Sequence, residues 1–369
     1  MMKSKPVNPV FLSAFILVSL LMVWARPSVM AAPAKQFQRS FDEKAVADFY
    51  RGKTVTIVVG FAPGGGYDIV SRLIAKHLGK YIPGRPNVIV DNRPGGGSVV
   101  AANLVYNVLR KDGTFIANFH SQMLLQQAEG REGIEFDGRR FDWLGSVSSS
   151  VGACALRRDT GMTHVKQMIG PSGRVVNMGA EAPGSGITDT TAIMRAALGL
   201  KFRIIYGYDG QRPIANAVLN RELDGFCTSW ESFVSTLKSF FEPVQLLNVV
   251  AVLGSSVPDH PWLKNAVAAE AMAPNEDARS LLKIVNAPRR LSYPYVVAPG
   301  VPNDRVASLR DAFDKTLADP AFSVDLTKLG IPLEPRTGEE AAQIVNEILS
   351  LKPEAVAALK EALKRKEGP

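Results

Sequence analysis

The chain has 369 residues, of which 46% are hydrophobic, and its 43 Lys and Arg against 35 Asp and Glu give a formal net charge of +8. Apart from a short basic group near the C-terminus the basic residues are spread along the chain, which argues against nucleic-acid binding. This length and composition are typical of a globular protein of two domains.

The first 32 residues have the pattern of a secretory signal. Lys3 and Lys5 precede an uncharged apolar segment, residues 10–25, and small residues follow at Ala31 and Ala32. Cleavage there would remove three basic residues and no acid, lowering the net charge from +8 to +5. We predict export to the periplasm, with an uncleaved membrane anchor as the alternative. No other uncharged apolar run reaches membrane-spanning length.

Only two cysteines are present, Cys154 and Cys227. They are too few for a disulfide scaffold, but one bridge is compatible with an oxidising compartment. The alternative is two buried thiols that pack as small apolar side chains. The sequence leaves this choice open.

A strand, a glycine turn and a helix are predicted over residues 54–78. The apolar, β-branched run at 54–61 is typical of a buried parallel strand, and the apolar residues that follow the turn recur at helical spacing. Residues 87–109 repeat the unit, and a third strand is expected at 114–120. Such repeats predict a parallel sheet in which the turns lie at the strands' carboxyl ends, where ligands bind in open α/β sheets.

Residues 141–150 are rich in small and hydroxyl side chains, and we expect the chain to cross there into a second α/β domain. Residues 291–300 are expected to return it as a strand to the first domain. Capped helices over 303–317 and 337–351 and an amphipathic stretch at 353–366 then complete that domain. The predicted parts are a signal peptide over 1–32, a first domain over 33–147 plus 292–369, and a second domain over 148–291. Two α/β domains joined by two crossings form a hinged cleft that can close around a small ligand.

The motifs of α/β enzymes are incomplete in this sequence. The first glycine turn lacks the Gly-Lys-Ser/Thr ending of a P-loop, and Ile69 stands where a dinucleotide fingerprint needs glycine. Pro183 replaces the first glycine of a nucleophile elbow. HExxH and CxxC patterns are absent, and the four histidines are scattered. We therefore expect a non-catalytic protein that uses no cofactor and no metal.

Several blocks in a fixed order carry a resemblance to a known family. They are Ala62–Asp68, Val90–Gly97, Lys111–Thr114, Ala182–Gly186, Tyr208–Gly210 and Leu223–Asp224. Over about residues 50–350 they resemble the TctC or Bug family, the periplasmic solute-binding proteins of tripartite tricarboxylate transporters. The resemblance implies a two-domain periplasmic-binding-protein fold of type II, a Venus flytrap. It also implies capture of a small organic acid or amino-acid-like ligand by a monomer that serves a membrane permease of a large and a small subunit.

The expected ligand donors are backbone N–H groups at two helix starts, residues 65–67 in the first domain and 184–186 in the second. Each helix-end interaction contributes roughly 0.3–2 kcal/mol to binding. Micromolar affinity requires about −8 kcal/mol, so side chains and bound water must supply the remainder. The predicted ligand-binding residues are Phe61, Ala62, Gly65, Gly66, Tyr67, Asp68, His120, Ser121, Ser149, Ser150, Gly184, Ser185, Gly186, Tyr208 and Asp209.

A structural role competes with ligand contact at several of these positions. Asp68 could bind a ligand amino or hydroxyl group, or it could stabilise its own helix. Ser185 could contact the ligand or support its turn. Gly66 is expected to need a backbone conformation or a close approach that a β-branched residue forbids. Arg93 is expected to support its turn, through carbonyl groups or through Asp91.

Two positions depart from the pattern of the family. Tyr67 stands where Thr or Ser is usual, and Asp209 stands where Lys is common. Both changes argue against a citrate-like ligand and favour a less highly charged acid, an amino acid or an aromatic acid. Residues 275–290 also look longer and more helical than the family's usual connection, and the sequence assigns them no function.

Two other functions stay open at this point. One is a sensory partner that presents its ligand to a membrane receptor. The other is a secreted α/β enzyme that uses Asp68, His120 and Ser185, which requires His120 within hydrogen-bond reach of Ser185 and an acid behind it.

Overall fold

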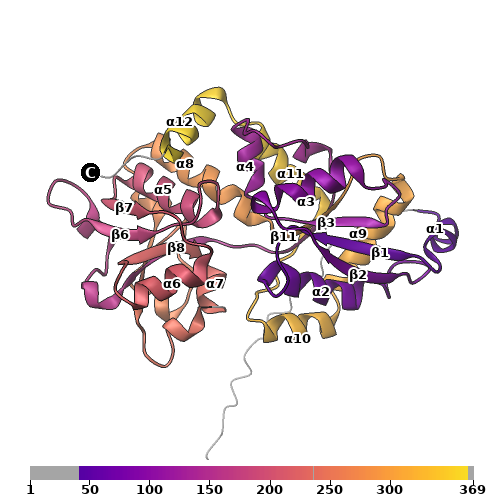
Figure 1. Ribbon diagram of the computed structural model, residues 1–369, viewed down its shortest axis with the longest axis horizontal. Coiled ribbons are helices and arrows are strands. Elements are labelled where there is room, and N and C mark those ends of the chain that lie inside the picture. Colours follow the sequence, from indigo (N-terminus) through magenta and orange to yellow (C-terminus); the bar gives the residue numbers. More distant parts are fainter. Residues whose placement is uncertain (1–40, 236, 365–369) are drawn as a thin grey trace, which may run out of the picture. The chain divides into compact units, whose positions relative to one another are not determined.

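The computed structural model describes residues 41–235 and 237–364. The predicted signal peptide lies outside these residues. Within the described ranges, no helix is both long enough and apolar enough to cross a membrane. These residues form two six-stranded sheets with helices packed on them (Figure 1).

The first sheet has the strand order β12-β4-β11-β3-β1-β2. Its strands are β1 (Thr54–Val59), β2 (Asn87–Asn92), β3 (Phe115–Asn118), β4 (Asp142–Ser148), β11 (Ser292–Val297) and β12 (Arg336–Thr337). β1 pairs in parallel with β2 and β3, which confirms the parallel sheet predicted from the repeated units. β11 runs antiparallel to β3 and β4, and β12 runs antiparallel to β4.

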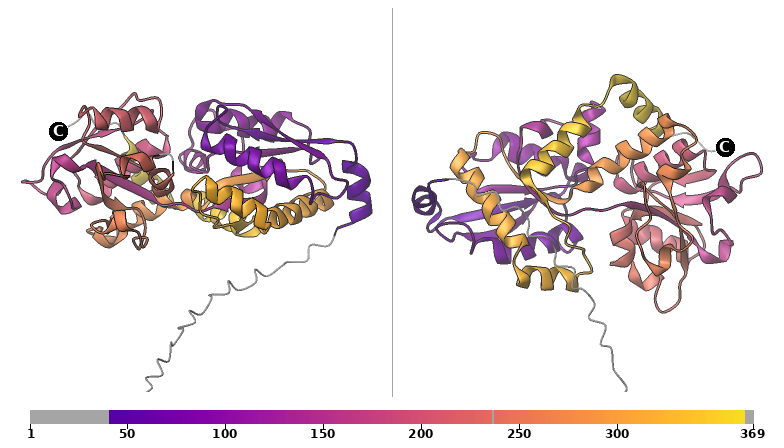
Figure 2. Two further views of the ribbon diagram at one scale, coloured as in Figure 1. Left: turned by 90° about the horizontal axis from the view of Figure 1, so that it is seen from below. Right: turned by 180° about the vertical axis from the view of Figure 1, so that it is seen from behind.

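The helices on the same side of the crossings as the first sheet are α1 (Glu43–Tyr50), which precedes β1, and α2 (Gly66–Leu78), α3 (Val99–Asn103), α4 (Met123–Ala128), α9 (Asn303–Leu317), α10 (Pro320–Lys328) and α11 (Gly338–Leu349). The apolar run of β1 is covered on both faces. Val55, Ile57 and Val59 share a core with α2, whereas Val58 points to the other face and shares a core with α3. Seen from behind, the C-terminal helices lie over the far face of the sheet, where α9 and α11 contact β4 (Figure 2). We call this sheet with these helices the first lobe.

The second sheet has the order β10-β9-β5-β8-β6-β7. Its strands are β5 (Gly152–Arg157), β6 (Val176–Gly179), β7 (Phe202–Ile205), β8 (Gly225–Ser229), β9 (Leu247–Val252) and β10 (Val267–Ala268). Its helices are α5 (Gly186–Leu198), α6 (Gln211–Leu219), α7 (Trp230–Val234) and α8 (Glu276–Asn286). β6 is parallel to β7 and β8, and β5 is antiparallel to β8 and β9. We call this sheet, with these helices and the final helix described below, the second lobe.

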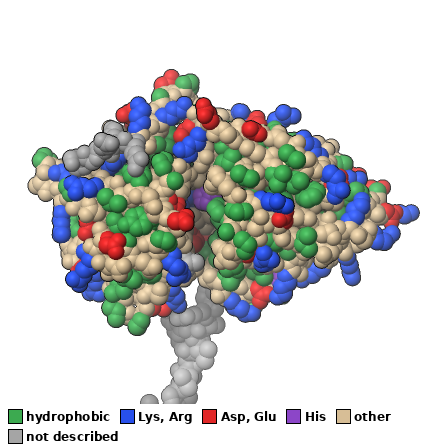
Figure 3. Space-filling model, viewed as in Figure 1, with side chains coloured by type: hydrophobic (Ala, Val, Ile, Leu, Met, Phe, Trp, Pro, Cys, Tyr) green, Lys and Arg blue, Asp and Glu red, His purple; other side chains and the backbone are tan. Residues whose placement is uncertain are grey.

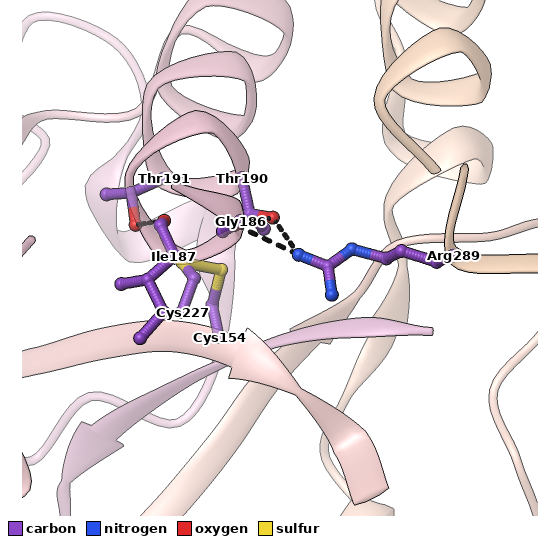
Figure 4. Close-up of a disulfide and its surroundings, with 7 residues drawn as sticks. All are labelled: Cys154, Gly186, Ile187, Thr190, Thr191, Cys227 and Arg289. Carbon is purple, nitrogen blue, oxygen red and sulfur yellow. Dashed lines mark hydrogen bonds between the residues drawn. A yellow bond between two sulfur atoms is a disulfide. The ribbon is translucent and has the colours of Figure 1, made fainter. Parts of the chain in front are cut away.

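A disulfide joins Cys154 and Cys227, which face each other in the antiparallel pairing of β5 with β8 (Figure 4). Both side chains are fully buried. The structure therefore settles the choice that the sequence leaves open, in favour of the bridge.

The prediction that residues 141–150 form a crossing is wrong for most of that segment. Residues 142–148 are β4, a strand inside the first sheet, and Trp143 is almost fully buried. The hydroxyl-rich pattern misleads because the buried Ser148 has a partner from a distant segment: its Oγ donates to the carbonyl oxygen of Pro332, at 2.7 Å. The crossing itself is shorter and spans residues 149–151.

The final helix, α12 (Pro353–Leu363), was expected on the first domain, and that expectation is wrong. α12 packs against α5 and α8 of the second lobe, and it buries Leu359 and Ala362 (Figure 1). The preceding helix, α11, packs on β4 of the first lobe. The chain therefore passes between the lobes at residues 350–352, in addition to the two predicted crossings.

Candidate ligand-binding site

Two similar loops begin α2 and α5, one in each lobe. The N–H of Gly64 donates to Asp68 Oδ2 at 2.8 Å, and the N–H of Gly184 donates to Asp189 Oδ1 at 3.0 Å. Both glycines have a positive φ, +83° and +90°, which other residues adopt only at a cost. In each loop an acid from the first helical turn thus fixes a sharp glycine turn, and the next backbone N–H groups stand at a positive helix end.

In the structure Gly64, and not Gly66, has the backbone conformation that favours glycine. Gly66 is the first residue of α2 and has no positive φ. A Cβ added to it would lie 3.4 Å from the hydroxyl of Tyr293, an ordinary contact distance. The prediction of a special backbone conformation at Gly66 is therefore wrong.

Asp68 is buried and has structural partners. Its carboxylate accepts from Gly64 N–H and from Arg72 Nε, and Arg72 Nη2 lies 2.9 Å from Oδ1. Burial alone would raise the pKa of Asp68, but the hydrogen bonds from Arg72 and Gly64 outweigh it and hold the pKa below its ordinary value. These contacts account for the helix-stabilising role. Ligand contact by Asp68 stays a prediction.

Four aromatic rings gather beside the first loop. The ring of Tyr67 lies 4.6 Å from that of Phe61, 4.9 Å from that of Tyr293 and 5.8 Å from that of His120, measured between centroids. We call these four residues the ring cluster. Tyr293 has a φ of +54°, which is rare for a large side chain and tends to occur at functional sites. The sequence analysis named the other three residues and missed Tyr293.

The second loop meets the first lobe at Gly186. A Cβ on Gly186 would lie 3.5 Å from His120 Cε1 and 3.6 Å from Arg289 Nη2. Close by, Gln126 Nε2 donates to the carbonyl oxygen of Gly184 at 3.0 Å. The structure therefore brings together His120 and residues 184–186, which the sequence analysis assigned to one site. Figure 3 shows a narrow groove between the lobes on one face of the molecule.

Arg289 is the main residue that the sequence analysis missed. It lies just before β11, and only 6% of it is exposed. Its Nη2 donates to the carbonyl oxygen of Gly186 at 2.9 Å and to Thr190 Oγ1, so the guanidinium points at the first turn of α5 (Figure 4). Burial lowers the pKa of Arg289. The unusual length of residues 275–290 was the one sequence signal near it.

His120 is neutral near pH 7. Its Nδ1 accepts from the N–H of Gln122 at 3.1 Å, so the neutral ring carries its proton on Nε2. Burial and, to a lesser degree, the charge of Arg289 lower the pKa of His120 to about 4. Its Nε2–H, close to Gly186, can donate to a ligand oxygen.

Two acids lie near Arg289, the buried Asp189 and the half-buried Glu231. Burial raises the pKa of Asp189 and that of Glu231 to about 7 each, and Arg289 opposes both shifts. Glu231 lies in the first turn of α7. At neutral pH these acids therefore compensate only part of the buried positive charge of Arg289.

The predicted serines mostly have structural partners. Ser121 Oγ donates to the carbonyl oxygen of Pro288 at 2.6 Å, and Ser149 Oγ pairs with Glu334. Ser185 Oγ accepts from Thr188 N–H and so caps α5. In the described part of the chain no hydrogen bond joins His120 to Ser185, which the enzyme alternative requires.

The remaining predicted residues are placed as follows. Ala62 and Gly65 are exposed on the first loop. Tyr208 and Asp209 lie between β7 and α6; Tyr208 N–H donates to Ala180 within the second lobe, and Asp209 is exposed. Arg93 pairs with Asp91 at 2.9 Å, which confirms its expected turn-supporting role. Among the described residues, no group of three or more His, Cys, Asp or Glu side chains could hold a metal ion.

No family model matches the chain. Two curated relatives match parts of it. One is the UPF0065 protein in the gbd 5' region of Cupriavidus necator, 35% identical over 81 residues, which are 22% of this chain and 24% of that protein. The other is the UPF0065 protein in the tcbD-tcbE intergenic region of Pseudomonas sp. strain P51, 30% identical over 93 residues, 25% of this chain and 27% of that protein. The chain thus aligns with about a quarter of each relative's length.

Solved structures match nearly the whole chain. A TctC solute-binding protein from Polaromonas superposes with a TM-score of 0.63 at 18% identity, over 85% of this chain and 99% of that one. The chain has the periplasmic-binding-protein fold. The prediction of a two-domain α/β fold of this kind is therefore confirmed, and the named neighbours agree with the resemblance noted in the sequence.

Two further structures with this fold hold small organic acids. MatC (Rpa3494) from Rhodopseudomonas palustris, with bound malate, has a TM-score of 0.59 at 17% identity, over 85% of this chain and 99% of that one. Rpa4515 of R. palustris, with adipate, has a TM-score of 0.60 at 19% identity, over 84% of this chain and 97% of that one. At such identities the likeness establishes the fold alone.

Proposed function

We propose that this chain is an extracytoplasmic solute-binding protein of the TctC or Bug type. It captures a small carboxylate-bearing ligand between its lobes and delivers it to a tripartite tricarboxylate-type permease with a large and a small membrane subunit. The chain acts as a monomer in the periplasm. The disulfide Cys154–Cys227 supports an oxidising compartment, as does the predicted signal over residues 1–32.

One observation carries this proposal: the helix start of the second lobe meets His120 of the first lobe at Gly186, and the ring of His120 lies 5.8 Å from that of Tyr67 in the first loop. Each loop presents a positive helix end, and Arg289 adds a buried guanidinium next to the second one. Helix starts and guanidinium groups both bind carboxylates favourably, the first through free N–H groups and the helix dipole, the second through charge-assisted hydrogen bonds. The neutral His120 adds a donor from the first lobe.

The contacts at the loops favour binding without turnover. Ser185 Oγ is used as the cap of α5, and Nδ1 of His120 already accepts from a backbone N–H. In the part of the chain that the structure describes, Ser185 Oγ bonds to Thr188 and not to His120, so these two residues do not form a pair of nucleophile and base. The site therefore has donors for an anion but no serine–histidine pair.

A thermal-shift screen of the mature protein tests the proposal. Ligands are mono-, di- and tricarboxylates, amino acids and aromatic acids, and hits are measured by calorimetry. A ligand at one hundred times its Kd stabilises the folded state by about 2.7 kcal/mol. We expect at least one class to raise the melting temperature, without chemical change of the ligand on prolonged incubation.

Matched variants locate the binding. His120→Ala should weaken it at least tenfold, whereas Arg93→Gln, which removes only an exposed ion pair with Asp91, should leave it unchanged. Absence of any hit across the panel, or equal binding by both variants, would count against the proposed site. Uptake by proteoliposomes that hold the permease, dependent on added binding protein, tests the delivery step.

A further inference from the structure

Three side chains at the junction of the lobes have buried polar atoms without a hydrogen-bond partner. The atoms are Arg289 Nε, Glu231 Oε2, and both Nε2 and Oε1 of Gln122. Arg289 is 6% exposed and Gln122 is 2% exposed. Because buried polar groups are almost always paired, an unpartnered set of this size needs an explanation.

Hydrogen bonds between segments hold these side chains around one place. Ser121, which precedes Gln122, donates to the carbonyl oxygen of Pro288, which precedes Arg289. On the other side, the N–H of Ser150 donates to the carbonyl oxygen of Arg289 at 2.9 Å. Next along the chain, the carbonyl oxygen of Val151 accepts from the N–H of Trp230, which directly precedes Glu231. The start of α4, the segment before β11 and the start of α7 thus converge.

The unpartnered atoms include both hydrogen-bond donors and acceptors. Arg289 Nε is a donor with a positive charge, Glu231 Oε2 is an acceptor on a carboxyl group, and the Gln122 amide offers one donor and one acceptor. Glu231 is the charged group that acts most strongly on Arg289, yet the two side chains form no ion pair within 4.0 Å. The Arg289 guanidinium and the Glu231 carboxyl group therefore lie near each other without a direct ion pair.

We propose that this site binds an α-amino acid in its zwitterionic form. The ligand carboxylate accepts from Arg289 Nε and from the first N–H groups of α5, and the ligand ammonium donates to Glu231 Oε2. Gln122 completes the hydrogen bonds of either group. The side chain of the ligand faces the ring cluster and is apolar. This inference rests on the proposed function and narrows its ligand class.

A simple carboxylate fits the same atoms less well. It would pair with Arg289 but leave the acceptor of Glu231 unsatisfied, with its own negative charge nearby. A dicarboxylate would add a second negative charge close to Glu231 and Asp189. The ammonium group of an amino acid instead lowers the pKa of Glu231, which burial raises to about 7, so binding near pH 7 releases a proton.

Ligand pairs that differ only in the amino group test the proposal on the full mature protein. The probes are L-phenylalanine against 3-phenylpropanoate and L-leucine against 4-methylpentanoate, titrated by calorimetry. We expect at least one amino acid to bind about 30-fold or more tightly than its deaminated partner, because loss of one member of a buried charge pair costs about that much. Titration in buffers of different ionisation enthalpy should show proton release at pH 7.

Variants then test which side chain binds the ammonium group of the ligand and which binds its carboxylate. Glu231→Gln should reduce the preference for the amino acid to less than tenfold, Arg289→Met should abolish binding of both partners, and Arg93→Gln should change neither. Equal or tighter binding of the deaminated acids, or binding of dicarboxylates such as malate alone, would overturn the zwitterion proposal and leave the solute-binding function standing. Failure of every organic acid and amino acid would overturn both. The ligand comparison needs no variant, so it decides the matter even if Arg289→Met does not fold.

Discussion

Removal of the disulfide should destabilise the protein by about 4 kcal/mol. The bridge joins residues separated by 73 positions, Cys154 in β5 and Cys227 in β8. In the chain-entropy treatment, a closed loop of this length lowers the entropy of the unfolded chain by about 15 cal/mol/K, or about 4.4 kcal/mol at 25 °C. The two strands pair around the bridge, so the reduced protein keeps the same contacts in the folded state. Reduction should therefore lower the free energy of unfolding mainly by raising the entropy of the unfolded chain.

Urea unfolding followed by circular dichroism, with and without reductant, measures this loss. Reduction of the natural protein removes the bridge without any substitution, and the double substitution Cys154→Ala with Cys227→Ala provides a second form without the bridge. Thiol titration of the denatured, unreduced protein should find no free thiol among the two cysteines. Two free thiols, or a loss below about 1 kcal/mol on reduction, would refute the reasoning.

Three further predictions concern the loops and the buried acid. Gly64→Ala should lower the free energy of unfolding by about 1–2 kcal/mol because its φ is +83°. Gly66→Ala, at a helical position with room for a Cβ, should leave the free energy of unfolding unchanged or raise it slightly. Equal effects of the two substitutions in calorimetric melting would contradict this. Asp68→Asn should destabilise by about 1–3 kcal/mol at pH 7. Because the pKa of Asp68 lies below its ordinary value, that difference should shrink as the pH falls below about 4, and a pH-independent difference in urea unfolding would argue against the hydrogen bonds as its cause. The Glu231 carboxyl group is protonated up to about pH 7 in the folded state but only up to about pH 4.5 in the unfolded chain. The free energy of unfolding therefore falls as the pH rises between these values, by at most about 3 kcal/mol. Glu231→Gln should therefore gain stability relative to the natural protein between pH 4 and pH 8, and a constant difference would show that the carboxyl group is not buried as described.

The fold follows from local patterns where burial and periodicity agree. β1 and α2 could be predicted because consecutive β-branched residues and apolar residues at helical spacing reflect the faces that the sheet buries. β4 could not, since its Ser146 and Ser148 resemble loop residues. They lie inside the protein only because segments distant in the sequence cover them, with Pro332 accepting from Ser148.

The site could be predicted only in its glycine loops. Gly184 and Gly186 have a local signal, and His120 follows a strand end. Arg289 and Glu231 have none, because charged side chains are usually exposed and these two are buried by contacts between segments far apart in the sequence. Such residues become recognisable only when the fold shows which hydrogen bonds they lack.

The passage of the chain at residues 350–352 has a mechanical consequence. Lobes joined by two neighbouring segments can swing about the line between them, and a third connection limits the range of that motion. α12 is anchored on α5, the helix whose first turn contacts Arg289, and α11 is anchored on β4. Strain applied to this connection is therefore transmitted to both sides of the ligand site. A label attached to α12 would report on lobe opening at a distance from the ligand.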